Sequence, residues 1–159
     1  MKSSIFTKMK LYTEYIEYLS QYNPDLLKMD TEDIKQLVTD YTYDKMSEWI
    51  DIKDDKLIVG FMIISTNPNE CRPDVDYEIA QMYISSDHRR KGLGRRVVFD
   101  YLSTHPGIYS LDIYDKNHSA SVFWNRVFRD VKAKQIILRE IRTDAEFLDK
   151  ITLYGYEVG

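Results

Sequence analysis

Residues 88–96, HRRKGLGRR, place five Lys and Arg side chains around two glycines in a chain of net charge −4. The preceding residues 76–84, DYEIAQMYI, have the composition of a β-strand. Beyond the glycines, Leu93, Val97, Val98, Tyr101 and Leu102 recur at helical spacing, so a helix is predicted to begin at or close to Gly92. Strand, glycine turn and helix form the arrangement in which backbone N–H groups bind an anion. Cations at a helix N-terminus are slightly unfavourable unless such an anion is bound there.

The glycine spacing restricts which anion-binding loop this is. A Rossmann fingerprint needs a third glycine where Val97 stands, and no segment here has the Gly-Lys-Ser/Thr ending of a P-loop. What fits is Arg-x-x-Gly-x-Gly over residues 89–94. The six-residue pattern is short, and its context therefore carries most of the argument.

Composition bounds the remaining possibilities. A chain of 159 residues with 43% hydrophobic and 30% charged residues predicts one globular domain over residues 1–159. No apolar run approaches the length of a membrane span, and the N-terminus lacks the apolar core of a signal peptide. The single cysteine, Cys71, excludes an internal disulfide; it is predicted to lie in a loop, and a reducing cytoplasm is the expected location.

Periodicity predicts mixed helices and strands along the chain. A first helix presents Ile5, Met9, Tyr12, Ile16 and Leu19, and a second presents Ile34, Leu37, Val38 and Tyr41. Residues 48–53 and 56–64 predict a hairpin, 76–84 and 108–114 two strands, and 131–141 and 151–158 two further strands, as antiparallel neighbours. A fourth helix presents Ala120, Phe123, Trp124, Val127 and Phe128, with Asn117 and Ser119 as capping candidates.

Residues 89–94 resemble the coenzyme A pyrophosphate loop of the GNAT superfamily of N-acetyltransferases. Residues 117–124, NHSASVFW, resemble the family's second cofactor motif, Asn-x-x-Ala-x-x-Phe-Tyr. The resemblance runs from the second helix to the C-terminus. It implies an α/β (α+β) fold, with a mixed, mostly antiparallel sheet of about six to seven strands and about four helices on its faces. The family usually opens with a strand, whereas this N-terminus predicts a helix.

The resemblance also implies the cofactor site. Main-chain groups of Met82, Tyr83 and Ile84 would pair with the pantetheine arm of acetyl-CoA, one N–H polarising the thioester carbonyl. The pyrophosphate would be held by Arg89, Arg90, Lys91, Gly92, Leu93, Gly94 and Arg95, and further cofactor contacts would come from Asn117, Phe123 and Trp124. For Asn117 a plain helix cap is an equal alternative, and for Trp124 a core position is the commoner one. No metal is implied.

Acetyl transfer to an amine requires a base, because an amine of pKa about 10 is mostly protonated at neutral pH. Glu78 stands eleven positions before Arg89, the spacing of the general-base glutamate in the histone-modifying branch of the family. Asp76 and Asp112 are weaker candidates. The usual acidic tyrosine is replaced by Trp124, whose indole N–H cannot shuttle a proton, which leaves Tyr114, Tyr83 or unaided departure of the thiolate.

The acceptor stays open. Aromatic and acidic side chains predicted on the substrate side could receive a cationic amine, or could be ordinary packing. They are Tyr12, Tyr15, Tyr18, Tyr22, Tyr41, Tyr43, Tyr154, Tyr156, Asp25, Asp30 and Glu32.

The sequence thus predicts an acetyl-CoA-dependent N-acetyltransferase acting on a small-molecule or protein amine, without a nucleic-acid or membrane partner; a homodimer is left open. Two alternatives are a non-catalytic acyl-CoA-binding module on the same fold and a nucleic-acid binder using residues 88–96. The net acidity counts against the latter.

Overall fold

The computed structural model describes residues 2–66, 72–139 and 151–159, so Cys71 and the end of the predicted strand 131–141 lie outside the described residues. The chain forms two compact units. The first comprises Met1–Ile64 and Gln81–Leu93, and the second comprises Ser65–Ala80 and Gly94–Gly159. The expectation of a single domain over 1–159 stays a prediction.

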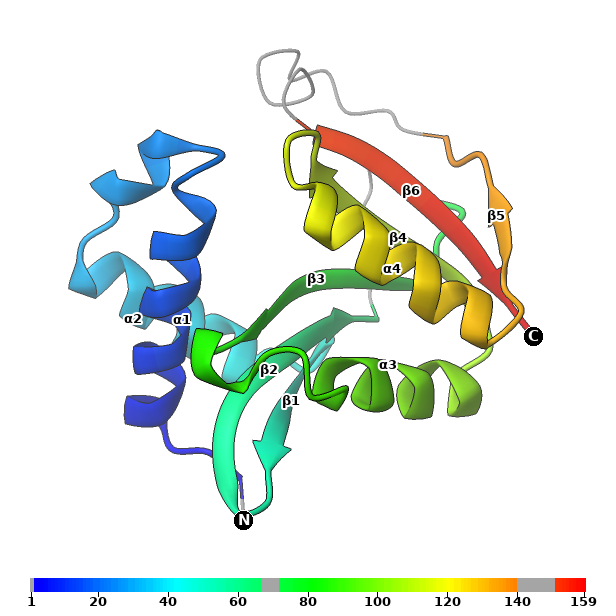
Figure 1. The fold of residues 1–159 in the computed structure, drawn as a ribbon. Coiled ribbons are helices and arrows are strands. Elements are labelled where there is room, and N and C mark those ends of the chain that lie inside the picture. The colour runs from blue at the N-terminus through cyan, green and yellow to red at the C-terminus, as the bar shows by residue number, and fades with distance from the viewer. Residues whose placement is uncertain (1, 67–71, 140–150) are drawn as a thin grey trace. The chain divides into compact units, whose positions relative to one another are not determined.

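The first unit begins with two helices and a hairpin (Figure 1). Its elements are α1 (Ile5–Leu19), the short 3₁₀ helix η1 (Pro24–Lys28), α2 (Thr31–Tyr43), β1 (Ser47–Asp54) and β2 (Leu57–Ser65). Asp30 caps α2 in a reciprocal capping box with Asp33, which satisfies backbone donors at both ends of the box. The hairpin turns at Asp55, whose φ is 55° and which lies between the two predicted strands.

The buried face of α1 differs from the predicted one. Tyr12 and Ile16 are buried as expected, but the other buried side chains are Lys8, Leu11 and Tyr15, whereas Ile5, Met9 and Leu19 are only half-buried. The reason is an aromatic core centred on Phe61 of β2, against which Tyr12 stacks at 5.7 Å and Tyr15 packs edge-on at 5.6 Å. Rings with this contact area outweigh the smaller aliphatic side chains in deciding which helix face is buried.

Strand β3 (Tyr77–Ile84) belongs to both units, with Gln81–Ile84 in the first and Tyr77–Ala80 in the second. The 3₁₀ helix η2 (Ser86–His88) follows it in the first unit. The second unit continues with α3 (Leu93–Thr104), which shares only Leu93 with the first, then β4 (Gly107–Tyr114), α4 (His118–Asp130), β5 (Lys134–Ile136) and β6 (Ile151–Val158). The helix predicted to begin near Gly92 is therefore confirmed.

In the second unit β4 pairs parallel with β3 and antiparallel with β6 along its whole length (Figure 1). One face of β4 and β6 packs against α4, where Phe128 stacks on Tyr156 at 3.9 Å and contacts Tyr109 at 6.1 Å. Tyr109, fully buried, also stacks on Tyr77 at 4.8 Å. This alternation places the intervening residues of β4 on the opposite face.

The strand order is β1-β2-β3-β4-β6-β5, a six-stranded, mostly antiparallel sheet within the described residues, and with α1 to α4 it confirms the predicted fold class. The helical N-terminus is also confirmed. The strand predicted over 131–141 is wrong in its bounds, because residues 131–133 complete α4: Val131 is its C-cap and Lys132 has a φ of 56°. No helix in residues 2–66, 72–139 or 151–159 is both long and apolar enough to span a bilayer.

Candidate functional site

The basic loop, defined as residues 88–96, connects β3 to α3 and contains two residues in the left-handed region. Arg90 has a φ of 63° and Gly92 a φ of 77°. Glycine adopts this conformation without strain, and a Cβ at position 92 would have no heavy atom within 4 Å. Backbone N–H groups that point together in such a turn, immediately before a helix, form an anion-binding concavity. The local geometry therefore fits the predicted phosphate-binding role.

Two side chains of the loop contact one carboxylate. Asp54, the last residue of β1, lies 3.0 Å from Nδ1 of His88 and 2.8 Å from Nζ of Lys91. Hydrogen bonds from Lys91 and His88 hold the pKa of the Asp54 carboxyl below its usual value. These contacts fix the loop to the β1–β2 hairpin within the first unit.

Arg89 folds back onto the strand that it follows. Its Nε donates a 2.7 Å hydrogen bond to the carbonyl of Ile84, and its guanidinium lies 4.7 Å and 5.2 Å from the ring centroids of Tyr18 and Tyr83. Burial raises the pKa of the Tyr83 hydroxyl, and the nearby Glu14 carboxylate adds to this rise. The Arg89 side chain thus stabilises the start of the loop, and its contact with pyrophosphate stays a prediction.

Arg95, in the first turn of α3, pairs with Asp130 at the end of α4 at 2.6 Å and 2.7 Å. This bidentate contact raises the pKa of Arg95 and lowers that of Asp130. Arg90 and Arg96 are exposed, and neither makes an ion pair within the part of the chain that the structure describes. Among the predicted pyrophosphate cations, Lys91 and Arg95 are engaged in ion pairs, whereas the exposed Arg90 shows none among the described residues.

The end of β3 is held at close range by β2. The main-chain N–H of Ser85 donates to the carbonyl of Val59 at 2.8 Å, and the carbonyl of Tyr83 would lie 2.3 Å from a Cβ added at Gly60. Only glycine permits such an approach. The main chain of Met82, Tyr83 and Ile84, predicted to face the cofactor, is therefore set by its packing on β2.

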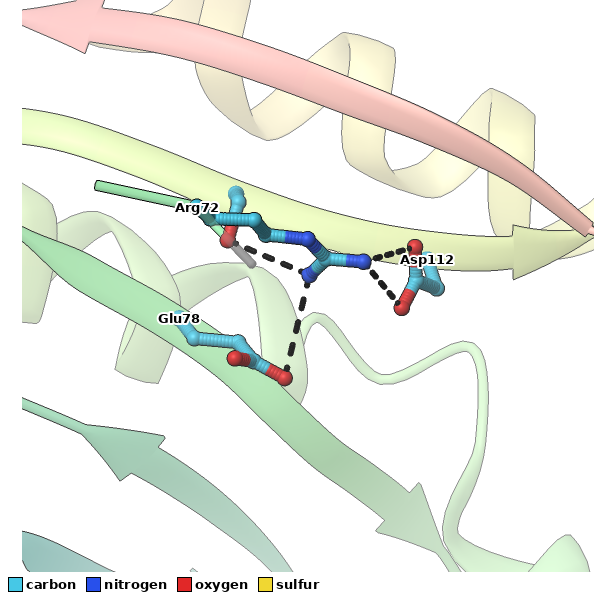
Figure 2. Close-up of polar contacts among 4 residues, drawn as sticks. Arg72, Glu78 and Asp112 are labelled. Atoms are coloured by element: carbon cyan, nitrogen blue, oxygen red, sulfur yellow. Dashed lines mark hydrogen bonds and ion pairs between the residues drawn. The ribbon is translucent and has the colours of Figure 1, made fainter. Parts of the chain in front are cut away.

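Three carboxylates were candidate bases, and all lie in the second unit. Asp76 accepts a 2.8 Å hydrogen bond from the main-chain N–H of Ile108. Asp112 accepts two 2.7 Å hydrogen bonds from Arg72, and Glu78 lies 3.9 Å from the same guanidinium (Figure 2). The side chain of Glu78 is 26% exposed. Arg72 was missed by the sequence analysis, because an arginine in a polar stretch gives no sign of being buried.

The second motif forms the start of α4. Asn117 caps the helix, its Oδ1 accepting a 3.1 Å hydrogen bond from the N–H of Ala120, so the capping alternative is confirmed. Trp124 is 7% exposed and lies 5.0 Å from Phe123 and 6.2 Å from Phe128, as the core alternative predicted. Tyr114 is the last residue of β4, and its main-chain carbonyl accepts a 2.8 Å hydrogen bond from the N–H of Asn117. Cofactor contacts of Asn117, Phe123 and Trp124 stay predictions.

The predicted site residues divide between the units. The first unit contains the end of β3 and the loop up to Leu93: Met82, Tyr83, Ile84, Arg89, Arg90, Lys91, Gly92 and Leu93. The second contains Glu78, Gly94, Arg95, Tyr114, Asn117, Phe123 and Trp124. Within each unit these residues are positioned by the contacts described above.

The residues considered for the acceptor side divide between packing and exposure. Tyr12, Tyr15 and Tyr156 are buried and belong to the aromatic cores, which favours the packing alternative for these three. Tyr43 is 72% exposed. Asp25 pairs with Lys28 at 3.1 Å, and Asp30 is engaged as the cap of α2.

Comparison with known proteins gives the family. The model of the acetyltransferase (GNAT) family matches residues 10–128. An acetyltransferase from Thermus thermophilus is 15% identical, with 96% of this chain and 92% of that chain covered and a TM-score of 0.65. An N-acetyltransferase from Staphylococcus aureus is 12% identical, with 97% and 94% covered and a TM-score of 0.61. Tetrahymena GCN5 is 15% identical, with 95% of this chain and 88% of that chain covered and a TM-score of 0.51.

At these identities the structural likenesses establish the fold alone. The search of curated proteins gave no match. The family match, however, extends over well more than half of the chain and includes both the basic loop and the Asn117 motif. The chain therefore belongs to the GNAT family of acetyltransferases.

Proposed function

We propose that the protein transfers an acetyl group from acetyl-CoA to a primary amine by direct attack within a ternary complex. The observation that carries the proposal is the family match over residues 10–128, which includes both segments assigned to the cofactor. No metal enters the proposed reaction. Cytoplasmic location stays a prediction.

The proposed cofactor contacts follow the sequence motifs. The pyrophosphate is bound by main-chain N–H groups of residues 90–95, supported by the left-handed conformations of Arg90 and Gly92 and by the dipole of α3. The Arg90 side chain supplies a positive charge from the surface of the loop. Main-chain groups of Met82, Tyr83 and Ile84 bind the pantetheine arm, and one N–H there donates to the thioester carbonyl.

Glu78 acts as the general base in this proposal. The amine nitrogen forms a bond to the acetyl carbon, its proton passes to the Glu78 carboxylate directly or through water, and the carbon–sulfur bond breaks to release the CoA thiolate. Glu78 is preferred over Asp76 and Asp112 because it stands eleven positions before Arg89, the spacing of the general-base glutamate in the histone-modifying branch of the family.

Protonation of the thiolate has weaker support. Trp124 replaces the usual tyrosine and its indole cannot release a proton to the thiolate. We propose Tyr114 at the end of β4 as the acid, with unaided departure of the thiolate as the alternative. A Tyr114→Phe variant with unchanged kcat at neutral pH would favour the unaided route.

The acceptor is proposed as an amine because the similar structures include enzymes named as N-acetyltransferases, among them the Staphylococcus aureus protein. Small polyamines, aminoglycosides, amino acid derivatives and protein lysines are all primary amines that this chemistry accommodates. A panel of spermidine, kanamycin, lysine amide and a lysine-containing peptide represents these classes.

The first experiment is thermal denaturation with and without acetyl-CoA. A ligand at about one hundred times its Kd adds about 2.7 kcal/mol, which raises the Tm by several degrees. The rise is expected for the wild type and is expected to be lost in Gly94→Glu and Arg90→Glu. Lys134→Glu, which changes an exposed residue of β5 by the same charge as Arg90→Glu, is the matched control and is expected to keep the rise.

Release of CoA thiol with the amine panel then tests catalysis. Turnover by the wild type and its loss in Glu78→Gln are expected. Cofactor binding without turnover on any amine would instead favour the non-catalytic acyl-CoA-binding module, the alternative that the buried Trp124 keeps open. An unchanged Tm at saturating acetyl-CoA would refute both.

A further inference from the structure

Arg72 is among the most buried side chains of the second unit, with 2% of its surface exposed. A guanidinium keeps its charge at any pH that a protein experiences, so it cannot escape the cost of burial by losing a proton. Its burial is tolerated only where carboxylates and other acceptors surround it. The groups around Arg72 therefore indicate what this residue is for.

The partners of Arg72 come from two neighbouring strands (Figure 2). One terminal nitrogen donates to both oxygens of Asp112 at 2.7 Å, and the other lies 3.5 Å from Oγ of Ser110. That second nitrogen is 3.9 Å from Oε1 of Glu78. One guanidinium thus lies between two carboxylates, one on β3 and one on β4.

The strand register places the partners of Arg72 on one face of the sheet. Glu78 pairs in register with Ser110 across the parallel β3–β4 ladder, and Asp112 lies two residues beyond Ser110. Side chains alternate along a strand, so these three lie on one face and Tyr109 lies on the other. Tyr109 packs on Tyr77, which shows that the opposite face is the aromatic core.

We propose that Arg72 is a positioning residue for Glu78, and that Asp112 holds Arg72 in the place from which it acts. The inference rests on the proposed function, in which Glu78 takes the proton of the amine. Arg72 touches neither substrate nor the reacting atoms in this proposal. It acts by fixing where the Glu78 carboxylate lies.

The unequal distances explain why the two carboxylates have different tasks. Asp112 accepts two short charge-assisted hydrogen bonds from one terminal nitrogen, which hold that end of the guanidinium in place. Glu78 is attracted by the same charge across 3.9 Å, a separation that directs its carboxylate without a hydrogen bond of normal length to the guanidinium. If Asp112 were uncharged, Arg72 would lose its two shortest charged hydrogen bonds, and the guanidinium would shift and displace the Glu78 carboxylate with it.

A double-mutant cycle between Arg72 and Glu78 tests the proposal. The measured quantities are kcat and KM at saturating acetyl-CoA, with whichever amine of the panel the wild type turns over fastest. Glu78→Gln is expected to lower kcat by about 10²–10⁴-fold, the usual contribution of a general base. Arg72→Gln is expected to lower kcat about 10–100-fold through misplacement of the carboxylate, with little change in KM for acetyl-CoA.

The decisive expectation concerns the double variant. If Arg72 acts through Glu78, Arg72→Gln has no further effect on kcat once Glu78 is glutamine, so the two losses do not multiply. Arg72→Lys is expected to restore part of kcat, because it keeps the charge but cannot place one nitrogen on Asp112 and a second beside Glu78. Asp112→Asn is expected to lower kcat while Arg72 is present and to have little effect in the Arg72→Gln background.

Folding is controlled in two ways. Arg72→Gln removes the counter-charge of Asp112, so the cycle is repeated with Arg72→Gln/Asp112→Asn, in which neither buried charge remains. Tyr109→Phe is the matched control on the opposite face of the same strand, where the hydroxyl donates to the carbonyl of His105 at 2.7 Å. It is expected to lower the Tm without changing kcat.

The outcomes separate this proposal from the proposed function. Failure of the wild type to release CoA with any amine, or full kcat in Glu78→Gln, would refute the proposed role of Glu78 and this inference with it. The role of Arg72 alone would be overturned by two results, each obtained together with a loss of kcat in Glu78→Gln. One is a wild-type kcat in Arg72→Gln, and the other is losses that multiply in the double variant.

Discussion

Replacing Gly60 by alanine tests whether the close approach of β2 sets the position of the β3 main chain. A Cβ at position 60 would lie 2.3 Å from the Tyr83 carbonyl oxygen and 3.0 Å from Cα of Ile84. Because Cβ atoms essentially never approach another heavy atom within 3.0 Å, the Tyr83 carbonyl must recede by about 0.7 Å. The obstacle is backbone, so no rotamer change relieves it.

The expected cost in stability is about 1–3 kcal/mol, as for other overpacked sites. For a chain of this length that corresponds to a fall in Tm of about 2–12 °C, measured by thermal denaturation. The displaced segment is the one proposed to bind the pantetheine arm. A misplacement approaching 1 Å in such a segment costs up to about 10²-fold, so kcat/KM for acetyl-CoA is expected to fall by as much.

Gly155→Ala is the control, because its closest Cβ contacts would be with a side chain, and the nearest backbone atom, the Ile136 carbonyl oxygen, would lie at 3.1 Å. The nearest atoms are Cγ and Cδ1 of Leu138 at 2.4 Å and 2.8 Å, which a change of rotamer can move away. We expect a loss of less than about 1 kcal/mol. The reasoning is refuted if Gly155→Ala is the more destabilising of the two, or if Gly60→Ala leaves both Tm and kcat/KM for acetyl-CoA unchanged.

Three further outcomes are expected. Gly92→Ala should lower the free energy of unfolding by about 1–2 kcal/mol, because the φ of 77° at this position is left-handed. Arg90→Gly should raise the free energy of unfolding, because glycine adopts the left-handed conformation of position 90 without strain. Chemical denaturation measures both changes, and changes in the same direction would contradict the argument. Asn117→Ala should cost about 1 kcal/mol through loss of the α4 cap, seen as a Tm lower by about 2–4 °C, and an unchanged Tm would show that the cap contributes nothing. Hydrogen bonds from Lys91 and His88 lower the pKa of Asp54 in the folded chain. Its contribution to stability is therefore present above its ordinary pKa of about 4 and is lost as the pH falls through the lower folded value. Asp54→Asn should therefore flatten the acid limb of a plot of stability against pH, and a limb identical to that of the wild type would contradict this.

The cations of the basic loop show which structural features a local sequence pattern can predict and which it cannot. The glycine turn and the helix start depend on residues that are adjacent in sequence, and both were predicted correctly. The partners of the cations did not follow, because Asp54 and Asp130 lie 37 and 35 residues away from Lys91 and Arg95. Such ion pairs depend on which elements meet, and periodicity contains no information about that.

By itself, the sequence determined the order and type of the elements, the glycine turn before α3 and the family. These features depend on short-range steric preferences, on the alternation of apolar residues and on motifs of fixed spacing. Only the tertiary structure decided that Arg72 is buried and that Glu78 and Asp112 share it. The physical reason is that the β3–β4 register places Glu78 beside Ser110 and Asp112, and the fold brings Arg72, 40 positions before Asp112, to these partners, without which a buried charge is not tolerated.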